Sequence, residues 1–88
     1  MNRRDRVAQV RASVLASIQR GERPFDHACV HCAESKAVLI LDDARGAHLA
    51  ELARDDCPRY RMQRIRRVLA IIDERFDLLM RPAAPGVH

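Results

Sequence analysis

The sequence predicts an all-α protein, a small antiparallel helical bundle of three to four helices with a long C-terminal helix. Only three residues are aromatic, Phe25, Tyr60 and Phe76, so the core must consist mainly of Val, Ile, Leu, Ala and Met, which suit close helix packing. Apolar residues recur at spacings of three and four in several segments, as expected for amphipathic helices. With 88 residues there is room for one core only.

The first helix is predicted to start after Asn2 and to end at Gly21. Asn2 can cap the helix, and Asp5 three positions later completes a pattern close to a capping box. Gly21 is expected to stop the helix because glycine adopts the left-handed conformation at little cost. The buried stripe of this helix is predicted from residues at 3-4-4 spacing: Val7, Val10, Val14 and Ile18.

A second helix is predicted from Asp26 to about Asp55. Asp26 is a suitable N-cap and would place Cys29 in the first turn. Gly46 either breaks this helix or lies within it, at a cost of about 1 kcal/mol relative to alanine. Residues 37–41 also fit a short strand, but a single strand without a partner would leave both its edges unpaired, so helix is preferred.

The last helix, over residues 59–80, has the clearest pattern, and Pro58 suits its start. Its apolar residues, called the seam below, alternate at spacings of three and four as in a coiled coil: Met62, Ile65, Leu69, Ile72, Phe76 and Leu79. The seam can close within one chain or between two chains, and we expect it to support a homodimer. Residues 1–80 are predicted to form a single helical domain, and 81–88 a disordered, proline-rich tail.

The composition limits the classes of function. The net charge is +4, with 15 arginines and one lysine, which is compatible with nucleic-acid binding but does not require it. No secretory signal and no apolar run long enough for a membrane span is present, so a cytoplasmic protein without membrane contact is predicted. Motifs for a phosphate loop, a nucleophile elbow or a zinc protease are absent from the sequence, so we expect no enzyme.

Residues 25–35, FDHACVHCAES, are the candidate metal or thiol site. Zinc requires four ligands, and the predicted set is Cys29, Cys32, Cys57 and His31, with His27 or His48 as alternatives to His31. A second close ligand pair is missing, so zinc is not the preferred interpretation and no cofactor is expected. A redox-active pair of thiols near a helix start is an alternative. We expect instead that Cys29 and Cys32 are small buried side chains of the core.

The predicted partner-binding residues lie in the first half of the last helix: Arg59, Arg61, Arg64, Arg66 and Arg67. Cations at the start of a helix are disfavoured by the helix dipole, so negatively charged groups should compensate them. Glu51, Asp55 and Asp56 could do so across the helix hairpin, and an acidic partner protein or a phosphate could do so from outside. We therefore expect a small non-enzymatic interaction or regulatory protein, an adaptor or inhibitor that binds an acidic surface. The alternatives are a metal- or thiol-responsive regulator and a helical module that binds nucleic acid.

Overall fold

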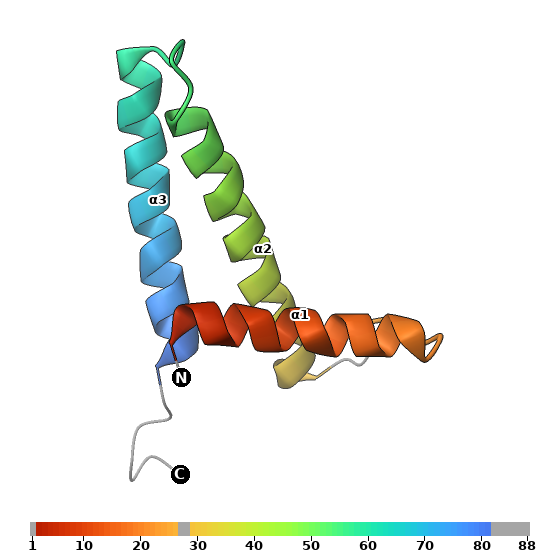
Figure 1. The fold of residues 1–88 in the computed structure, drawn as a ribbon. Coiled ribbons are helices and arrows are strands. Elements are labelled where there is room, and N and C mark those ends of the chain that lie inside the picture. Colours follow the sequence, from red (N-terminus) through yellow and green to blue (C-terminus); the bar gives the residue numbers. More distant parts are fainter. Residues whose placement is uncertain (1, 27–28, 82–88) are drawn as a thin grey trace, which may run out of the picture.

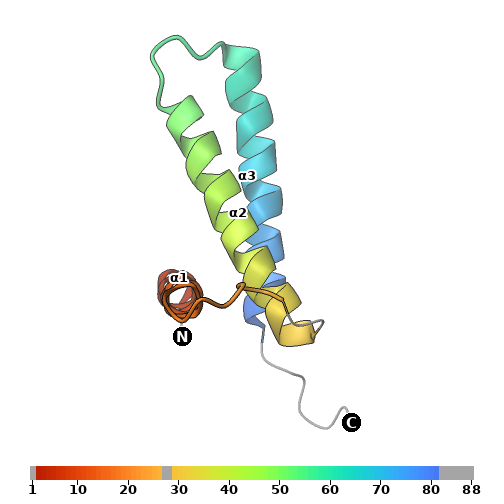
Figure 2. The same ribbon diagram turned by 90° about the vertical axis from the view of Figure 1, so that its right-hand side faces the viewer.

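The computed structural model describes residues 2–26 and 29–81, and over these residues the protein is all-helical with three helices. They are α1 (Arg3–Gln19), α2 (Val30–Leu52) and α3 (Arg59–Met80). Helices α2 and α3 form an antiparallel hairpin, and α1 crosses this hairpin near the end remote from its turn (Figure 1). In Figure 2 α1 is seen end-on while the hairpin stands upright. The prediction of an all-α protein is confirmed.

No helix in the described part of the chain has the length and apolar character needed to cross a membrane.

Helix α1 begins and ends as its sequence predicts. The Asn2 Oδ1 atom accepts a hydrogen bond of 2.8 Å from the backbone N–H of Asp5, which satisfies one of the free amides of the first turn. At the other end Gly21 has a φ of 74°. Its N–H donates to the Ile18 carbonyl, and the Glu22 N–H donates to the Ser17 carbonyl, the pair of bonds that defines a Schellman motif.

The predicted start of α2 is wrong. The helix begins at Val30, with Cys29 rather than Asp26 as its N-cap. Phe25 follows Pro24 in a left-handed conformation (φ 63°), and its ring packs against the core, so the chain is still turning where the helix was expected to begin. His27 lies outside the described residues.

The rest of α2 agrees more closely with the pattern. Residues 37–41 are helical, as preferred over the strand alternative, and Gly46 lies inside the helix. The helix ends at Leu52, three residues before the predicted end, because residues 53–58 form the turn of the hairpin. The third helix has the predicted bounds, whereas most of the predicted tail, residues 82–88, lies outside the described residues.

The core lies where the three helices meet, and we call this place the junction. Its buried side chains come from all three helices: Val7, Val10, Val38, Ile72 and Phe76. Phe76 is completely buried, and the Arg3 guanidinium lies 4.7 Å from the centre of its ring. Ile65 is also buried, between the helices of the hairpin but outside this cluster. The apolar burial is therefore concentrated at one end of the molecule.

Ion pairs link α1 to both helices of the hairpin. The Arg11 guanidinium contacts Asp42 at 2.7 Å and Asp43 at 2.8 Å on α2. Arg3 contacts Asp73 on α3 at 2.6 Å. Each pair of this kind contributes about 0–1 kcal/mol, but together they favour one crossing position of α1. Arg3 also accounts for two acidic residues in the second half of α3, Asp73 and Asp77, which the helix dipole alone would disfavour.

Replacing Phe76 with alanine should destabilise the protein by about 3–5 kcal/mol, because the lost ring leaves a cavity at the junction. Leu78→Ala on the same helix removes a side chain that is half exposed and should cost less than about 1 kcal/mol. Urea denaturation followed by circular dichroism measures both. Equal losses in the two variants would contradict the position of the core.

Replacing Gly46 with alanine should stabilise the protein by about 0.5–1 kcal/mol, since alanine favours the helix and an added Cβ meets no atom within 4 Å. Gly21→Ala is the matched control and should destabilise by about 1 kcal/mol, because φ at that position is positive. Thermal melting of both variants gives the signs. If both variants changed the melting temperature in the same direction, either Gly46 would not be inside a helix or Gly21 would not have a left-handed backbone conformation.

Candidate functional site

Only one of the five predicted partner-binding arginines has an ion pair within the described residues. The Arg61 Nε atom lies 3.0 Å from Oε2 of Glu51 across the hairpin, and this hydrogen-bonded carboxylate raises the pKa of Arg61. Of the other two acids expected to compensate, Asp56 contacts Arg54 within the turn instead, and Asp55 makes no ion pair in the described part of the chain. The internal compensation is therefore limited to Arg61.

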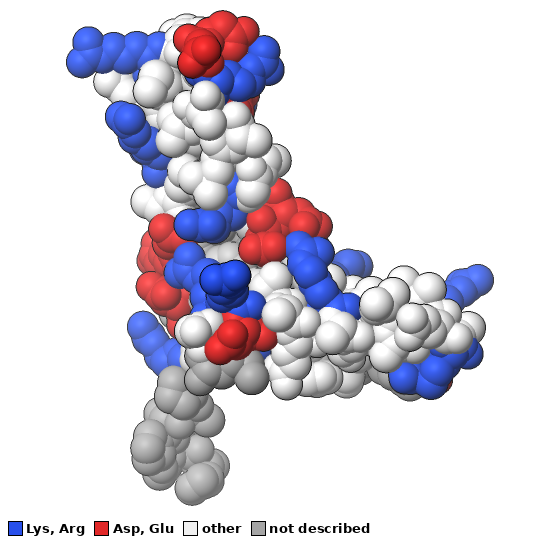
Figure 3. Space-filling model, viewed as in Figure 1, with Lys and Arg blue, Asp and Glu red and all other residues white. Residues whose placement is uncertain are grey.

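The other four arginines of this group are exposed and make no ion pair with any described residue: Arg59, Arg64, Arg66 and Arg67. Helix α3 starts at Pro58 with no side-chain cap and no acidic residue in its first turn. Its positive end thus carries additional positive charge, which disfavours the helix by some tenths of a kcal/mol per side chain. In Figure 3 Lys and Arg side chains lie along the left-hand edge of the molecule at the upper part of α3, while acidic side chains lie over the turn at the top and again lower down.

The face of α3 that points away from the hairpin is both basic and apolar. At 100° per residue these basic and apolar residues fall on one side of the helix, opposite the seam, with the exposed Glu74 beside them. All are exposed, and we call the basic and apolar ones the outer stripe: Tyr60, Arg64, Arg67, Ile71 and Leu78. Tyr60 is 75% exposed, Ile71 54% and Leu78 51%. Ile71 and Leu78 were not predicted as site residues, although their seven-residue spacing is visible in the sequence as a second apolar phase beside the seam.

The seam itself packs largely inside the chain. Ile65, Ile72 and Phe76 are buried by the chain's own residues, and the other three seam residues are partly buried: Met62, Leu69 and Leu79. The use of the seam by a second chain stays a prediction. The outer stripe is the side of α3 that the described residues leave uncovered.

The predicted zinc ligands do not come together. Cys29, Cys32 and His31 lie at the start of α2, whereas Cys57 lies in the turn at the other end of that 23-residue helix. His48 is within α2, where its Nδ1 atom is 2.7 Å from the carbonyl oxygen of Ala44. Within residues 2–26 and 29–81, no three His, Cys, Asp or Glu side chains are placed so that they could hold one metal ion.

Cys29 and Cys32 are not core residues, so the preferred interpretation of the sequence was wrong. Cys29 is exposed and Cys32 is partly exposed, and neither is part of a disulfide. The physical reason is the late start of α2, which puts Cys29 at the tip of the helix rather than on its inner face.

The position of Cys29 at the N-cap of α2 lowers the pKa of its thiol. The Sγ atom accepts a hydrogen bond of 3.4 Å from the backbone N–H of Cys32. This amide, then the Cys32 thiol, and to a smaller extent the N–H of His31 lower the pKa of Cys29 by stabilising its thiolate. The amides of the first turn of α2, a natural anion site, are thus directed at sulfur.

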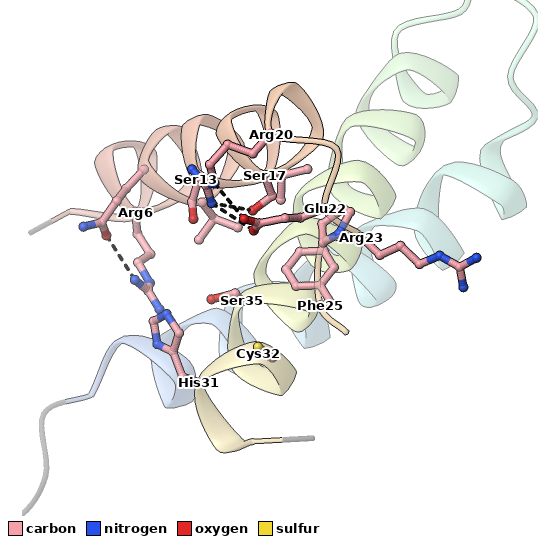
Figure 4. Close-up of a pocket in the computed structure, with 14 residues that line it drawn as sticks. Arg6, Ser13, Ser17, Arg20, Glu22, Arg23, Phe25, His31, Cys32 and Ser35 are labelled. Carbon is pink, nitrogen blue, oxygen red and sulfur yellow. Dashed lines mark hydrogen bonds and ion pairs between the residues drawn. The ribbon is translucent and has the colours of Figure 1, made fainter. Parts of the chain in front are cut away.

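A cavity of about 400 Å³ lies beside this thiol pair, between α1, residues 20–25 and the start of α2. Cys32 and Ser35 line it from α2, and Arg6 lines it from α1 (Figure 4). Ser35 is only 8% exposed, and its hydroxyl makes no hydrogen bond to a described residue. In the described part of the chain, every side-chain oxygen that is fully enclosed has a hydrogen-bond partner. Because the Ser35 hydroxyl has no such partner, it is not fully enclosed, and it opens into the cavity that Ser35 lines.

Comparison with protein-family models, curated proteins and solved structures found no match for this chain. The functions of the outer stripe and of the Cys29–Cys32 pair with its cavity are therefore inferred from their own side chains.

Cys29 should react with iodoacetamide at a lower pH than Cys57, because the thiolate is the reactive form and the pKa of Cys29 is lowered. Cys57 is a matched control, since it also precedes a helix, but α3 has no side-chain cap. The measurement is alkylation of each cysteine between pH 5 and 9, followed by peptide mass spectrometry. The Cys29 profile should lie at lower pH, and superimposable profiles would contradict the capping geometry.

Proposed function

We propose that this protein is a small non-enzymatic interaction or regulatory protein, of the adaptor or inhibitor type, that binds an acidic partner protein through the outer stripe. The observation that carries the proposal is the coincidence, on one helix face, of exposed apolar side chains and exposed arginines that pair with no acid in residues 2–26 and 29–81. Tyrosine and arginine are enriched among residues that dominate binding at protein interfaces. Arginine also forms paired hydrogen bonds with carboxylates.

The apolar part of the stripe favours protein over nucleic acid. Ile71 and Leu78 are half exposed and would gain nothing from a phosphate backbone. Between these two residues the helix carries Asp73, Glu74 and Asp77, which would repel phosphates. Tyr60 is the one aromatic residue of the stripe, whereas single-strand binding generally uses several stacking rings.

The dimensions of the stripe suggest the form of the partner. From residue 60 to residue 78 it extends about 27 Å along α3, at 1.5 Å per residue. Its arginines lie toward the start of the helix, and its two aliphatic residues lie toward the end. An amphipathic helix with acidic residues at one end of its apolar face would match this order, with bonds to Arg64 and Arg67 and apolar contacts to Ile71 and Leu78.

The extended form of the molecule also supports a binding role. The radius of gyration over Cα atoms is 16.0 Å, compared with about 12 Å for a compact domain of this length. Such a shape presents more surface than a compact domain.

The double variant Arg64→Ala/Arg67→Ala should bind an acidic amphipathic helical peptide about tenfold more weakly or worse. It loses two charge-assisted contacts, and each contributes about 1 kcal/mol or more to the binding free energy. The probe is a fluorescent peptide with leucines at i, i+3 and i+7 and glutamates beside the first of them. Fluorescence anisotropy gives the affinity, and circular dichroism confirms that the variant remains folded.

The matched control is the double variant Arg20→Ala/Arg54→Ala, which loses the same charge away from the outer stripe. It should retain binding, and a scrambled peptide of the same composition should bind weakly to the unmodified protein. Equal loss in both double variants would reduce the binding to net charge. If a single-stranded oligonucleotide bound more tightly than the peptide, with a steep dependence on salt, the partner would be a nucleic acid and not an acidic protein.

A further inference from the structure

We propose that Cys29 and Cys32 form a thiol–disulfide exchange site whose substrate is a small anionic disulfide bound in the neighbouring cavity. This site lies at the end of the hairpin opposite the 53–58 turn and shares no residue with the outer stripe. It can therefore be tested separately from the proposed partner binding.

The two thiols are placed for different roles. Cys29 is exposed at the tip of α2, where a disulfide can approach its sulfur. Cys32 is less exposed, lines the cavity and lies within hydrogen-bonding reach of the Cys29 sulfur through both its amide and its thiol. Cys29 is thus the attacking thiol, and Cys32 is the resolving thiol.

The reaction balances without a metal or a further oxidant. The Cys29 thiolate attacks one sulfur of the small disulfide RSSR, so that a mixed disulfide Cys29–S–S–R forms and one RS⁻ leaves and takes up a proton. The Cys32 thiol loses its proton to solvent and attacks the Cys29 sulfur, which releases the second RS⁻. The sum is protein dithiol plus RSSR giving protein disulfide plus two RSH, so the protein is oxidised and the small disulfide is reduced.

The cavity supplies the features that select a small anionic substrate. Its volume of about 400 Å³ suits a small molecule. The Ser35 hydroxyl opens into it without a partner among the described residues, and a bound ligand would satisfy that hydroxyl. Arg6 donates to the neutral side chain of Gln9, so its charge remains available to a carboxylate of the substrate. In contrast, the charge of Arg20 is balanced by Glu22.

The experiment follows freshly reduced full-length protein with Cys57→Ser, which removes the third thiol, during incubation with glutathione disulfide. Intact mass spectrometry should show loss of two hydrogen atoms, and peptide mapping should place the new disulfide between Cys29 and Cys32. Adding Cys32→Ser should trap a glutathione adduct on Cys29. Adding Cys29→Ser instead should slow adduct formation on Cys32 several-fold or more.

The cavity is tested by the charge of the substrate. Arg6→Gln should slow the reaction with glutathione disulfide several-fold and leave the reaction with the neutral bis(2-hydroxyethyl) disulfide unchanged. Arg4→Gln, the same charge loss on α1 outside the cavity, should change neither rate. Circular dichroism checks that all variants retain their helices.

Three results would overturn the proposal. An adduct on Cys29 that persists in the protein with both thiols would exclude resolution by Cys32. Equal rates for Cys29 and Cys32 as single remaining cysteines would remove the distinct roles. An Arg6→Gln effect that is the same for both disulfides, or the same as that of Arg4→Gln, would exclude the cavity as the place where the substrate binds.

Discussion

The structure depends on the burial of Phe76 at the junction. The hairpin of α2 and α3 covers one side of this ring, and α1 contributes Val7 and Val10 to the cluster around it, with the Arg3 guanidinium over the ring. An amphipathic helix has to bury its apolar stripe against another element, and the crossing helix completes the cluster that the hairpin begins. The same packing leaves the outer stripe of α3 uncovered, because α1 lies against the hairpin only near one end.

Local signals in the sequence were sufficient to predict the helices that have clear caps and regular spacing. The third helix was predicted with its correct bounds because Pro58 and the seam act within a few residues. The start of α2 could not be predicted in this way, because Asp26 is a suitable cap by residue type, whereas the structure packs the partly buried Phe25 ring against the core and keeps residue 25 in a left-handed turn. The crossing of α1 was not predictable either, since it rests on contacts such as Arg11 with Asp42, 31 positions apart.

The same distinction holds for the candidate sites. The sequence showed the arginines of α3 and offered Glu51, Asp55 and Asp56 as acids that could pair with them across the hairpin. It did not show that only Glu51 would do so, with Arg61, and leave the other four arginines without ion partners in the described residues. It showed the spacing of Cys29 and Cys32, but not that Cys57 lies at the far end of a long helix, which depends on α2 continuing through Gly46. The outer stripe could have been predicted from the sequence, because its residues follow the helical period of α3 on the face opposite the seam.

The uneven distribution of the core has a consequence for motion. Amide hydrogens near the junction are held by side chains from three helices, whereas those near the 53–58 turn are held by a hairpin in which Ile65 is the buried apolar residue. Hydrogen exchange should therefore be graded along α2 and α3, slow at one end and fast at the other through local fraying. The start of α3 lies at the fast end, so its arginines sit on the part of the molecule that opens with the least free energy.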